Sequence, residues 1–302
     1  MVLLVTGSSG FIGSHIAEEL LFRGEKVIGL DILPPPESIA KNRKFTFRKT
    51  DILSEHELCR IGGGVSSIYH FAANCSVTEC TEKPEKALQN IQSTFNILEA
   101  ARKNDVEHVI FASSSTVYGE VALLPIREEY LLKPISNYGL SKLICEQYLE
   151  YYARIYGIKG TALRYANIFG PRAMRGVMFD LYNKLRRDPT KLEILGNGKQ
   201  SKSYLFITDA VRATLFAAEK QEKSFEAFNV GSEEMRSTDW IARVICKQLR
   251  VKPRFVHSGG DRGWVGDVRK MLLDVTKLKK LGWKPKVPLK EGIRSYIQYI
   301  QK

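Results

Sequence analysis

The sequence predicts an α/β protein with a doubly wound parallel sheet and a smaller, mixed α/β lobe. The first half alternates short, nearly continuous apolar runs with longer amphipathic stretches, the pattern of parallel strands covered by helices on both faces. In the second half, the apolar runs become shorter and the Gly-rich loops longer, at 196–198 and 259–266. Because no low-complexity linker separates the halves, we expect the two lobes to pack together.

Each expected element follows from these patterns in chain order. Apolar runs predict strands in the first half at 2–5, 26–31, 45–48, 67–71, 108–112 and 160–163. Amphipathic stretches between them predict helices at 11–23, 85–103 and 137–156. The second half predicts helices near 177–187, 209–219, 239–250 and from 289 to the end, with strands near 192–194 and 203–206. We divide the chain into a first domain of residues 1–170, to which roughly 205–232 return, and a second lobe of 171–204 and 233–302.

Composition excludes several classes of protein. The 302 residues are 44% hydrophobic and 26% charged, which is typical of a globular chain rather than a disordered one. No apolar run approaches the ~18 residues that span a bilayer, and the N-terminus lacks the basic start of a signal peptide. The five cysteines are scattered without a CxxC pair, which predicts reduced thiols, a cytoplasmic location and no metal site.

The charge is strongly basic, with 46 Lys and Arg against 33 Asp and Glu, a net charge of +13. Such a charge attracts nucleic acids, anionic lipids or phosphorylated small molecules. The basic residues are spread along the chain, and no nucleic-acid-binding motif accompanies them. We therefore expect solvated basic surfaces, no nucleic-acid partner and no membrane partner, and we keep nucleic-acid binding as the last alternative.

A glycine-rich turn ends the first expected strand and opens the first expected helix. Gly7 permits the sharp turn, Gly10 lets the backbone approach a pyrophosphate, and Gly13 lets the helix pack on the strand. Free N–H groups at the start of the helix then face the anion. The second strand ends at Asp31, where a carboxylate binds a ribose 2′-hydroxyl and repels a 2′-phosphate. These features predict a Rossmann-like domain that binds NAD rather than NADP; the alternative is a structural turn without a ligand.

Tyr138 and Lys142 lie four residues apart in an expected helix and therefore share one face. A free tyrosine has a pKa of ~10 and is a poor base at neutral pH. Lys142 and the positive nicotinamide ring of NAD⁺ stabilise the phenolate, and lowering the pKa to ~7 requires ~4 kcal/mol. Hydroxyl-rich residues 113–116 follow an expected strand, at the sheet edge where ligands bind in such folds. The alternatives are a surface Tyr–Lys pair and a loop that only caps the strand.

With its GxxGxxG turn and the motifs that follow, the chain resembles the extended short-chain dehydrogenase/reductases, and within them the NAD-dependent epimerase/dehydratase family of nucleotide-sugar enzymes. The resemblance runs nearly end to end. The matching positions are 5–13, 31, 50–53, 70–73, 90–101, 112–119, 138–142, 163–171, 196–209, 228–232 and 280–285. It implies that NAD is held by Gly7, Gly10, Phe11, Ile12, Gly13, Asp31, Ile32, Asp51, Ile52, Phe71, Ala72, Ala73, Asn90, Tyr138, Lys142 and Tyr165. For Asn90 the alternative is a buried polar residue of the core.

The resemblance also assigns the catalytic hydroxyl. Counting back from 117–119 places it on Ser114, which joins Tyr138 and Lys142 as the catalytic residues. The dehydratases and decarboxylases of the family carry an acid after this hydroxyl, whereas this chain has Ser115 and Thr116. Hydroxyls are not general acids at neutral pH. Oxidation and re-reduction without elimination is what remains.

The expected reaction is 4-epimerisation of a UDP-hexose, UDP-galactose or UDP-glucose. Tyr138 takes the proton of the sugar 4-hydroxyl, and hydride moves from C4 to NAD⁺. The 4-keto sugar then turns over, and hydride returns to its opposite face. A 4-epimerase of UDP-GlcNAc or UDP-glucuronate is the close alternative. A nucleotide-sugar oxidoreductase and a catalytically silent NAD-binding scaffold are more distant ones.

The second lobe is expected to hold the UDP-sugar. The resemblance implies that the substrate-binding residues are Ser114, Ser115, Asn167, Val177, Lys202, Tyr204, Arg262 and Asp267. Lys202 stands where the family usually has Arg, and Trp264 where it has a second Arg, so that Arg262 takes over that role. Lys keeps the charge of Arg but loses its bidentate geometry. Asp267 either binds a ribose hydroxyl or caps a turn, and loop 170–177 is expected to close over the nucleotide.

The expected helices at 85–103 and 137–156 carry more apolar surface than one sheet face needs. The residues concerned are Ile91, Phe95, Ile97, Leu98, Leu143, Ile144, Tyr148 and Tyr151. The family pairs these two helices across a two-fold axis, so the resemblance predicts a homodimer. The alternative is a single buried face with exposed tyrosines.

Overall fold

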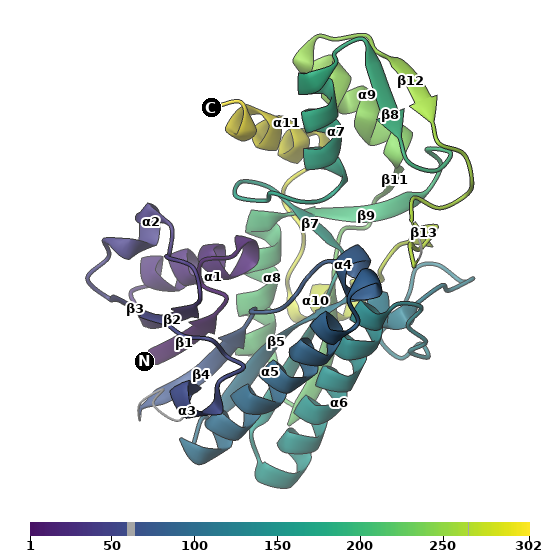
Figure 1. Cartoon of the computed structure of the whole chain (residues 1–302). Helices are drawn as coiled ribbons and strands as arrows, with labels where there is room; N and C mark the ends of the chain where they lie inside the picture. Colours follow the sequence, from purple (N-terminus) through teal and green to yellow (C-terminus); the bar gives the residue numbers. More distant parts are fainter. Residues whose placement is uncertain (59–63, 265) are drawn as a thin grey trace.

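The computed structural model describes residues 1–58, 64–264 and 266–302. Its largest element is a seven-stranded sheet in the order β10-β6-β5-β4-β1-β2-β3, with every pair of neighbours parallel (Figure 1). The strands are β1 (Val2–Thr6), β2 (Lys26–Asp31), β3 (Phe45–Lys49), β4 (Val65–His70), β5 (His108–Ser114), β6 (Lys159–Tyr165) and β10 (Phe225–Val230). Together with the second lobe described below, this sheet confirms the predicted fold class.

Successive side chains of a strand point to opposite faces, and each face of this sheet has its own core. Leu3 and Val5 belong to the core that includes residues of α1 (Phe11–Phe22) and α8 (Ile207–Lys220). Leu4 belongs to the core formed with α5 (Glu85–Lys103) and α6 (Asn137–Tyr156). In Figure 1, α5 and α6 run side by side across that second face. The shorter helices of this region are α2 (Glu37–Ala40), α3 (Glu55–Leu58), α4 (Val77–Glu82) and η1 (Ser115–Tyr118).

A smaller lobe is built on β9 (Ser201–Phe206), which pairs antiparallel with β11 (Met235–Ser237) and parallel with β7 (Asn167–Phe169) and β13 (Lys270–Met271). A separate parallel pair joins β8 to β12. Its remaining elements are β8 (Lys191–Ile194), β12 (Arg254–His257), α7 (Val177–Arg187), α9 (Thr238–Leu249) and α11 (Leu289–Ile300). The core on the α1 and α8 face continues into this lobe, so the two lobes pack together as expected.

The chain passes between the lobes several times. The seventh strand, β10, was not among the expected strands, because its first residues are only half-buried and show no clear apolar run. It pairs with β6 in the large sheet. Later, α10 (Thr276–Leu281) packs on β10 and α8. The extent of each lobe along the sequence stays a prediction, and α10 is a part of 233–302 that lies against the large sheet.

The outward face of α5 and α6 differs from the expected set. Ile97 and Leu98 are fully buried on the sheet-facing side of α5. They are therefore not part of the surplus apolar surface to which the sequence analysis assigned them. Helical periodicity places them on the inner face, together with the sheet residues of the second core. The exposed apolar residues of the two helices are Leu88, Phe95, Leu140, Tyr148, Tyr151, Ile155 and Tyr156.

Two further features of the described residues concern membranes and thiols. None of the described helices combines the length and the apolar character that crossing a bilayer requires. Cys75, Cys80, Cys145 and Cys246 are free thiols. Cys59 lies outside the described residues.

Candidate active site

The glycine turn between β1 and α1 is shaped by close backbone contacts. Gly7 has a φ of +69°, and a Cβ there would lie 2.7 Å from the backbone nitrogen of Ala72. A Cβ on Gly13 would lie 2.2 Å from the carbonyl oxygen of Gly7. Only glycine permits this conformation and this approach without strain. Gly10 caps α1 without a side chain, and the first turn of α1 has no acidic residue, so its N–H groups offer a positive end to a phosphate.

The Asp31 carboxylate lies beside this turn at the end of β2. It accepts hydrogen bonds from the backbone nitrogens of Ser9 and Leu33, both at 3.0 Å. Ile32 is 59% exposed. Ser8 Oγ is buried and has no hydrogen-bond partner among the described residues, which is uncommon for a buried hydroxyl. A bound dinucleotide fits this cradle, which consists of the glycine turn, the Asp31 carboxylate and the unpartnered Ser8 hydroxyl.

Thr6 holds the other wall of the cradle and was not found from the sequence. Its Oγ1 accepts hydrogen bonds from the backbone nitrogens of Phe71 and Ala72, both at 3.2 Å, and lies 2.8 Å from Nδ1 of His70. The residues after β4 are thereby held against the glycine turn. Its only sequence signal was its place directly before Gly7.

Several of the expected cofactor residues make contacts within the protein. Asn90 is buried, and its amide binds the backbone nitrogen of Asn74 at 2.7 Å and the Asn74 carbonyl at 3.1 Å. This geometry supports the alternative of a buried polar residue, which here fixes the backbone after Ala73. The Tyr165 hydroxyl binds Thr214, while its ring centroid lies 6.3 Å from that of Phe71.

Asp51 and Ile52, the residues predicted to flank the adenine, follow the C-terminal end of β3. Asp51 accepts a hydrogen bond from the backbone nitrogen of Leu53 at 2.9 Å. Ile52 packs partly buried against the core beneath α5, and its carbonyl accepts a hydrogen bond from Asn96 at 3.1 Å. The contacts of Asp51 and Ile52 with the adenine stay a prediction.

Ser114, Tyr138 and Lys142 come together where the end of β5 meets the start of α6. A Cβ on Gly139 would lie 2.7 Å from the carbonyl oxygen of Thr116, so the glycine lets the first turn of α6 fit against η1. The Ser114 side chain lies near enough to the Tyr138 phenol to favour a lower pKa by hydrogen bonding. Ser114 Oγ also accepts hydrogen bonds from Thr116, at 3.2 Å from its backbone nitrogen and 3.0 Å from its hydroxyl.

The buried Lys142 ammonium lies near the Tyr138 ring. Its Nζ donates a hydrogen bond to the Ala112 carbonyl at 2.8 Å and lies 4.7 Å from the Phe111 ring centroid and 5.8 Å from that of Tyr138. Burial raises the pKa of the Tyr138 phenol well above its ordinary value, against the bond from Ser114, and burial lowers the pKa of Lys142. Burial thus opposes the predicted phenolate, which the positive charges of Lys142 and NAD⁺ would favour.

A buried ion pair that the sequence analysis missed lies beneath these residues. Arg164 Nη2 donates a hydrogen bond to Glu146 Oε2 at 2.7 Å, and the two side chains are 6% and 4% exposed. Ser113, next to Ser114, also donates to Glu146, and Arg164 Nη1 donates to the Tyr118 hydroxyl at 2.9 Å. The pair thus links β5, η1, α6 and β6. The available signal was the position of Glu146, four residues beyond Lys142 on one helix face.

On the small lobe, the structure brings Lys202, Arg262 and Asp267 together. Lys202 forms an ion pair with the buried Asp267, and its Nζ lies 4.8 Å from the Trp264 ring centroid. Arg262 Nη1 donates a hydrogen bond to the Asp267 carbonyl at 2.9 Å. The Asp267 carboxylate accepts one from the backbone nitrogen of Gly263 at 3.0 Å, which fits its alternative role of capping a turn.

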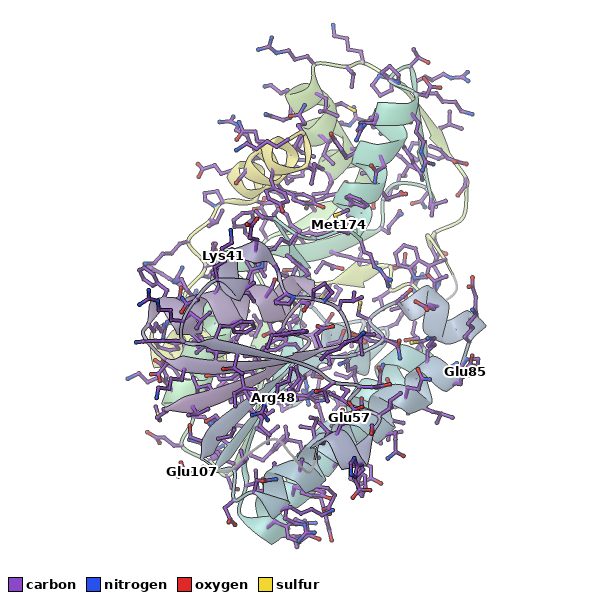
Figure 2. All side chains as sticks on the ribbon, turned by 60° about the vertical axis from the view of Figure 1, so that its left-hand side comes forward. Lys41, Arg48, Glu57, Glu85, Glu107 and Met174 are labelled. Atoms are coloured by element: carbon purple, nitrogen blue, oxygen red, sulfur yellow. The ribbon has the colours of Figure 1, made fainter. Side chains whose placement is uncertain are left out.

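The other expected substrate residues make contacts within the protein. Asn167 donates a hydrogen bond to the Ser203 carbonyl at 3.1 Å, which ties β7 to β9. Tyr204 is buried on β9, and burial raises the pKa of its phenol. Ser115 is buried in η1, and Val177 begins α7 and packs on the main core. In the loop before α7, Met174 is 65% exposed and lies at the junction of the lobes (Figure 2).

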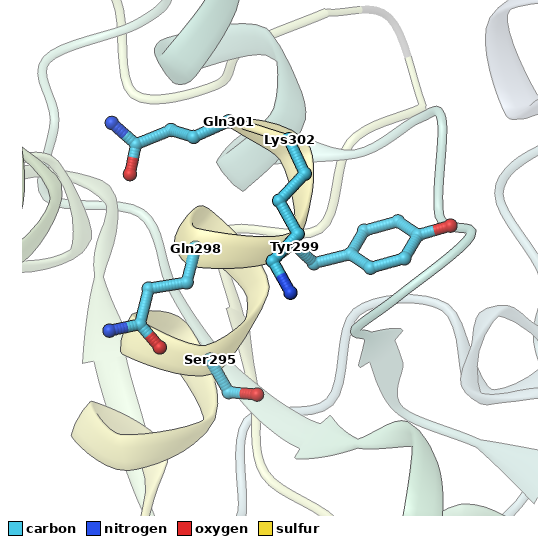
Figure 3. Close-up of a pocket in the computed structure, with 5 residues that line it drawn as sticks. All are labelled: Ser295, Gln298, Tyr299, Gln301 and Lys302. Carbon is cyan, nitrogen blue, oxygen red and sulfur yellow. The ribbon is translucent and has the colours of Figure 1, made fainter.

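A separate hollow lies at the end of α11, in the small lobe. It has a volume of about 480 Å³ and is lined by Ser295, Gln298, Tyr299, Gln301 and Lys302 (Figure 3). None of these residues belongs to the cradle or to the Ser–Tyr–Lys group. We therefore assign the hollow no part in the site.

The fold and the Ser–Tyr–Lys arrangement define an extended short-chain dehydrogenase/reductase. Residues 3–231 match the NAD dependent epimerase/dehydratase family, and the chain belongs to this family. It is an enzyme of the family, and its cofactor is NAD.

Similar proteins match this chain over its whole length. A putative UDP-glucose 4-epimerase of Methanocaldococcus jannaschii is 33% identical over 307 residues, which cover 99% of this chain and 98% of the relative. The solved UDP-glucose 4-epimerase of Thermotoga maritima with UDP-glucose has a TM-score of 0.92 at 35% identity, covering 100% and 99% of the two chains. The UDP-glucuronic acid 4-epimerase of Bacillus cereus, solved with UDP-glucuronic acid and NAD, has a TM-score of 0.92 at 29% identity and the same coverage.

Proposed function

We propose that this enzyme interconverts UDP-galactose and UDP-glucose by 4-epimerisation. The names of the relatives from Methanocaldococcus jannaschii and Thermotoga maritima support this sugar. The observation that carries the chemistry is the hydroxyl at position 116. Thr116 donates to Ser114 at 3.0 Å, in the place where an eliminating enzyme needs an acid. A site with a base and no such acid favours a reaction that ends without loss of water.

In the proposed reaction, Tyr138 accepts the proton of the sugar 4-hydroxyl, and Ser114 holds that hydroxyl in line. Lys142 stabilises the phenolate from below, since its ammonium is fixed between Ala112 and Phe111. Bound NAD supplies the acceptor and donor of hydride at C4. The glycine turn and Asp31 would hold it. The resulting 4-keto sugar turns over while the small lobe retains its diphosphate, and Tyr138 then returns the proton to the new hydroxyl.

The diphosphate is assigned to Lys202 and Arg262. Both cations lie in one network through Asp267, and guanidinium and ammonium groups bind phosphate oxygens strongly. Arg262 offers the fork geometry that Lys202 lacks. This division of labour replaces the two arginines usual in the family.

We also propose a homodimer through α5 and α6. The outward apolar residues of these neighbouring helices support it, with Phe95 and Tyr148 in an edge-on contact of 5.9 Å between ring centroids. Light scattering after size exclusion should give about twice the 34.2 kDa of one chain. A single-chain mass would contradict the dimer.

The test of the reaction is to incubate the purified protein with UDP-galactose without added NAD. Anion-exchange chromatography and proton NMR should show UDP-glucose at an equilibrium ratio. UDP-glucuronate and UDP-GlcNAc are assayed in parallel, because one similar structure holds UDP-glucuronic acid. Conversion of only one of these would replace the proposed sugar. Net turnover of added NAD without epimerisation would replace the reaction with that of an oxidoreductase.

A further inference from the structure

Glu120 connects the catalytic segment to the small lobe. It follows Gly119, which ends η1, and lies six residues after Ser114. Its carboxylate accepts a hydrogen bond from Arg262 Nη2 at 2.9 Å. It also accepts three from Arg269, from Nη2 at 3.1 Å and from Nε and the backbone nitrogen at 3.2 Å each. The two arginines stand 142 and 149 residues later in the chain, so one carboxylate joins two distant segments.

Arg262 is held from two sides by this arrangement. One terminal nitrogen binds the Asp267 carbonyl and the other binds Glu120. Asp267 in turn pairs with Lys202. Both cations assigned to the diphosphate therefore belong to a network that ends on Glu120. Burial opposes ionisation of Glu120, yet the bonds and charges of Arg269 and Arg262 hold the pKa of its carboxyl below the ordinary value.

The same segment passes close to the catalytic helix. A Cβ on Gly266 would lie 3.4 Å from Cβ of Ser136, the N-cap of α6, and 3.8 Å from Cγ1 of Val77. Ser136 stands two residues before Tyr138. The backbone beside Asp267 is thus packed at the start of the catalytic helix, and Arg262 donates a hydrogen bond to the carbonyl of that same Asp267.

We propose that Glu120 is a positioning residue for the diphosphate of the nucleotide sugar and acts through Arg262. This inference rests on the proposed function. A guanidinium fixed before the substrate arrives loses less side-chain freedom on binding than a free one, and such pre-organisation raises affinity. Glu120 has no contact with Ser114, Tyr138 or Lys142 in the structure. Its effect therefore falls on affinity and KM rather than on kcat.

A merely structural role makes a different prediction. The Glu120 side chain is 26% exposed, and those of Arg262 and Arg269 are 37% and 53% exposed. Ion pairs with that exposure contribute little to the free energy of unfolding. For a structural role, loss of Glu120 would lower Tm only slightly and leave the affinity for UDP unchanged.

The experiment compares Glu120→Gln with Asp261→Asn in the full-length, NAD-loaded enzyme. Asp261 accepts a hydrogen bond from Arg269 at 3.2 Å. Its variant therefore removes a carboxylate that belongs to the same cluster but that Arg262 does not contact. UDP affinity is measured by calorimetry, and KM and kcat with UDP-galactose. We expect Glu120→Gln to weaken UDP binding and raise KM about five- to ten-fold, the effect of freeing one or two side-chain rotors, with kcat within about two-fold. Asp261→Asn should change neither by more than about two-fold.

A double-mutant cycle with Arg262→Met tests the route of the effect. If Glu120 acts through Arg262, Glu120→Gln has no further effect on UDP affinity once Arg262 is replaced. An equal loss in both backgrounds overturns the proposal, as do equal UDP affinities of the wild type and Glu120→Gln. A wild-type enzyme that binds no UDP would instead overturn the proposed function, and this inference with it.

Discussion

The two regions of the molecule differ sharply in charge and in how their charged groups are placed. Residues 171–204 and 233–302 carry 25 Lys and Arg against 10 Asp and Glu, a net charge of +15, while the rest carries 21 against 23. Nitrogen-tipped side chains surround the small lobe in Figure 2. The positive net charge therefore comes from residues 171–204 and 233–302, the predicted second lobe, of which α10 lies against the large sheet. It suits the proposed role of this region in holding the diphosphate, beside a nearly neutral region that contains Ser114, Tyr138 and Lys142.

Two ion pairs, one from each region, differ strongly in burial. The Arg164–Glu146 pair under the catalytic helix is 6% and 4% exposed, whereas Arg262 and Glu120 are 37% and 26% exposed. Removing one partner of a buried pair leaves a charge without solvent or partner. Removing a partner in an exposed pair leaves a charge that water can solvate. Comparable substitutions should therefore affect stability at the first pair and ligand affinity at the second.

The largest effect expected from the large domain is on catalysis alone. Tyr138→Phe removes the proton acceptor, and general acid–base groups contribute about 10²- to 10⁴-fold to rate. We expect kcat for UDP-galactose to fall by at least about 100-fold, with UDP affinity unchanged because the small-lobe network is intact. Tyr299→Phe, on the exposed end of α11, is the matched control and should retain full activity. Substantial activity of Tyr138→Phe would mean that another group accepts the proton.

Next in size is the cost of breaking the buried pair. Glu146→Gln should lower the free energy of unfolding by about 3–5 kcal/mol, because Arg164 keeps its charge in a buried place. Urea unfolding measures this loss. Glu150→Gln, one turn further along α6 and exposed, should cost less than about 1 kcal/mol. If the two variants are equally stable, burial of the Arg164–Glu146 pair does not govern stability here.

A smaller effect should distinguish the affinity for NAD from the affinity for UDP. Asp31→Asn should weaken NAD binding about 10- to 100-fold, the size expected when a charged hydrogen-bond acceptor is lost, and leave UDP affinity unchanged. Activity recovered during NAD titration of charcoal-treated enzyme reports the first, and calorimetry the second. Glu37→Gln serves as the control, since its side chain is 79% exposed on α2. Equal losses for both ligands would show that the regions do not bind independently.

The smallest expected effect is that of salt. Raising NaCl from about 50 to 300 mM shortens the screening length from over 10 Å to well under 8 Å. UDP affinity should fall several-fold because the small lobe carries the positive charge, while NAD affinity should change less than two-fold. Calorimetry at the two salt concentrations makes the comparison. A matching loss for NAD would show that the net charge of the whole chain, rather than its position, attracts anions.

Much of the fold could be predicted because local signals were clear. Helices 85–103, 137–156 and 177–187 have the predicted bounds. In α6 the signal was the amphipathic pattern, and the structure shows Ser136 capping the start of the helix and Gly157 ending it with a φ of +73°. The strands β7, β11 and β13 have only two or three residues, too few for an apolar pattern. They form because β9 offers them a partner, and pairing partners distant in sequence leave no local signal.

The site divides in the same way. Motif spacing was enough to nominate Gly7, Asp31, Tyr138 and Lys142, since each belongs to a short, recognisable pattern. The partners that hold those residues were not predictable. Thr6, Arg164 and Glu120 act through contacts across 46 to 149 residues, and such contacts exist only in the folded chain.

The passage from β9 into α8 bears on how such an enzyme can be redesigned. Phe206 ends the strand and Ile207 begins the helix, with no residue between them. The middle strand of the small sheet and a covering helix of the large sheet are therefore one uninterrupted stretch of backbone. The small lobe therefore cannot be exchanged between relatives as a separate unit. A change in ligand binding therefore has to be made by substituting individual side chains within the intact chain.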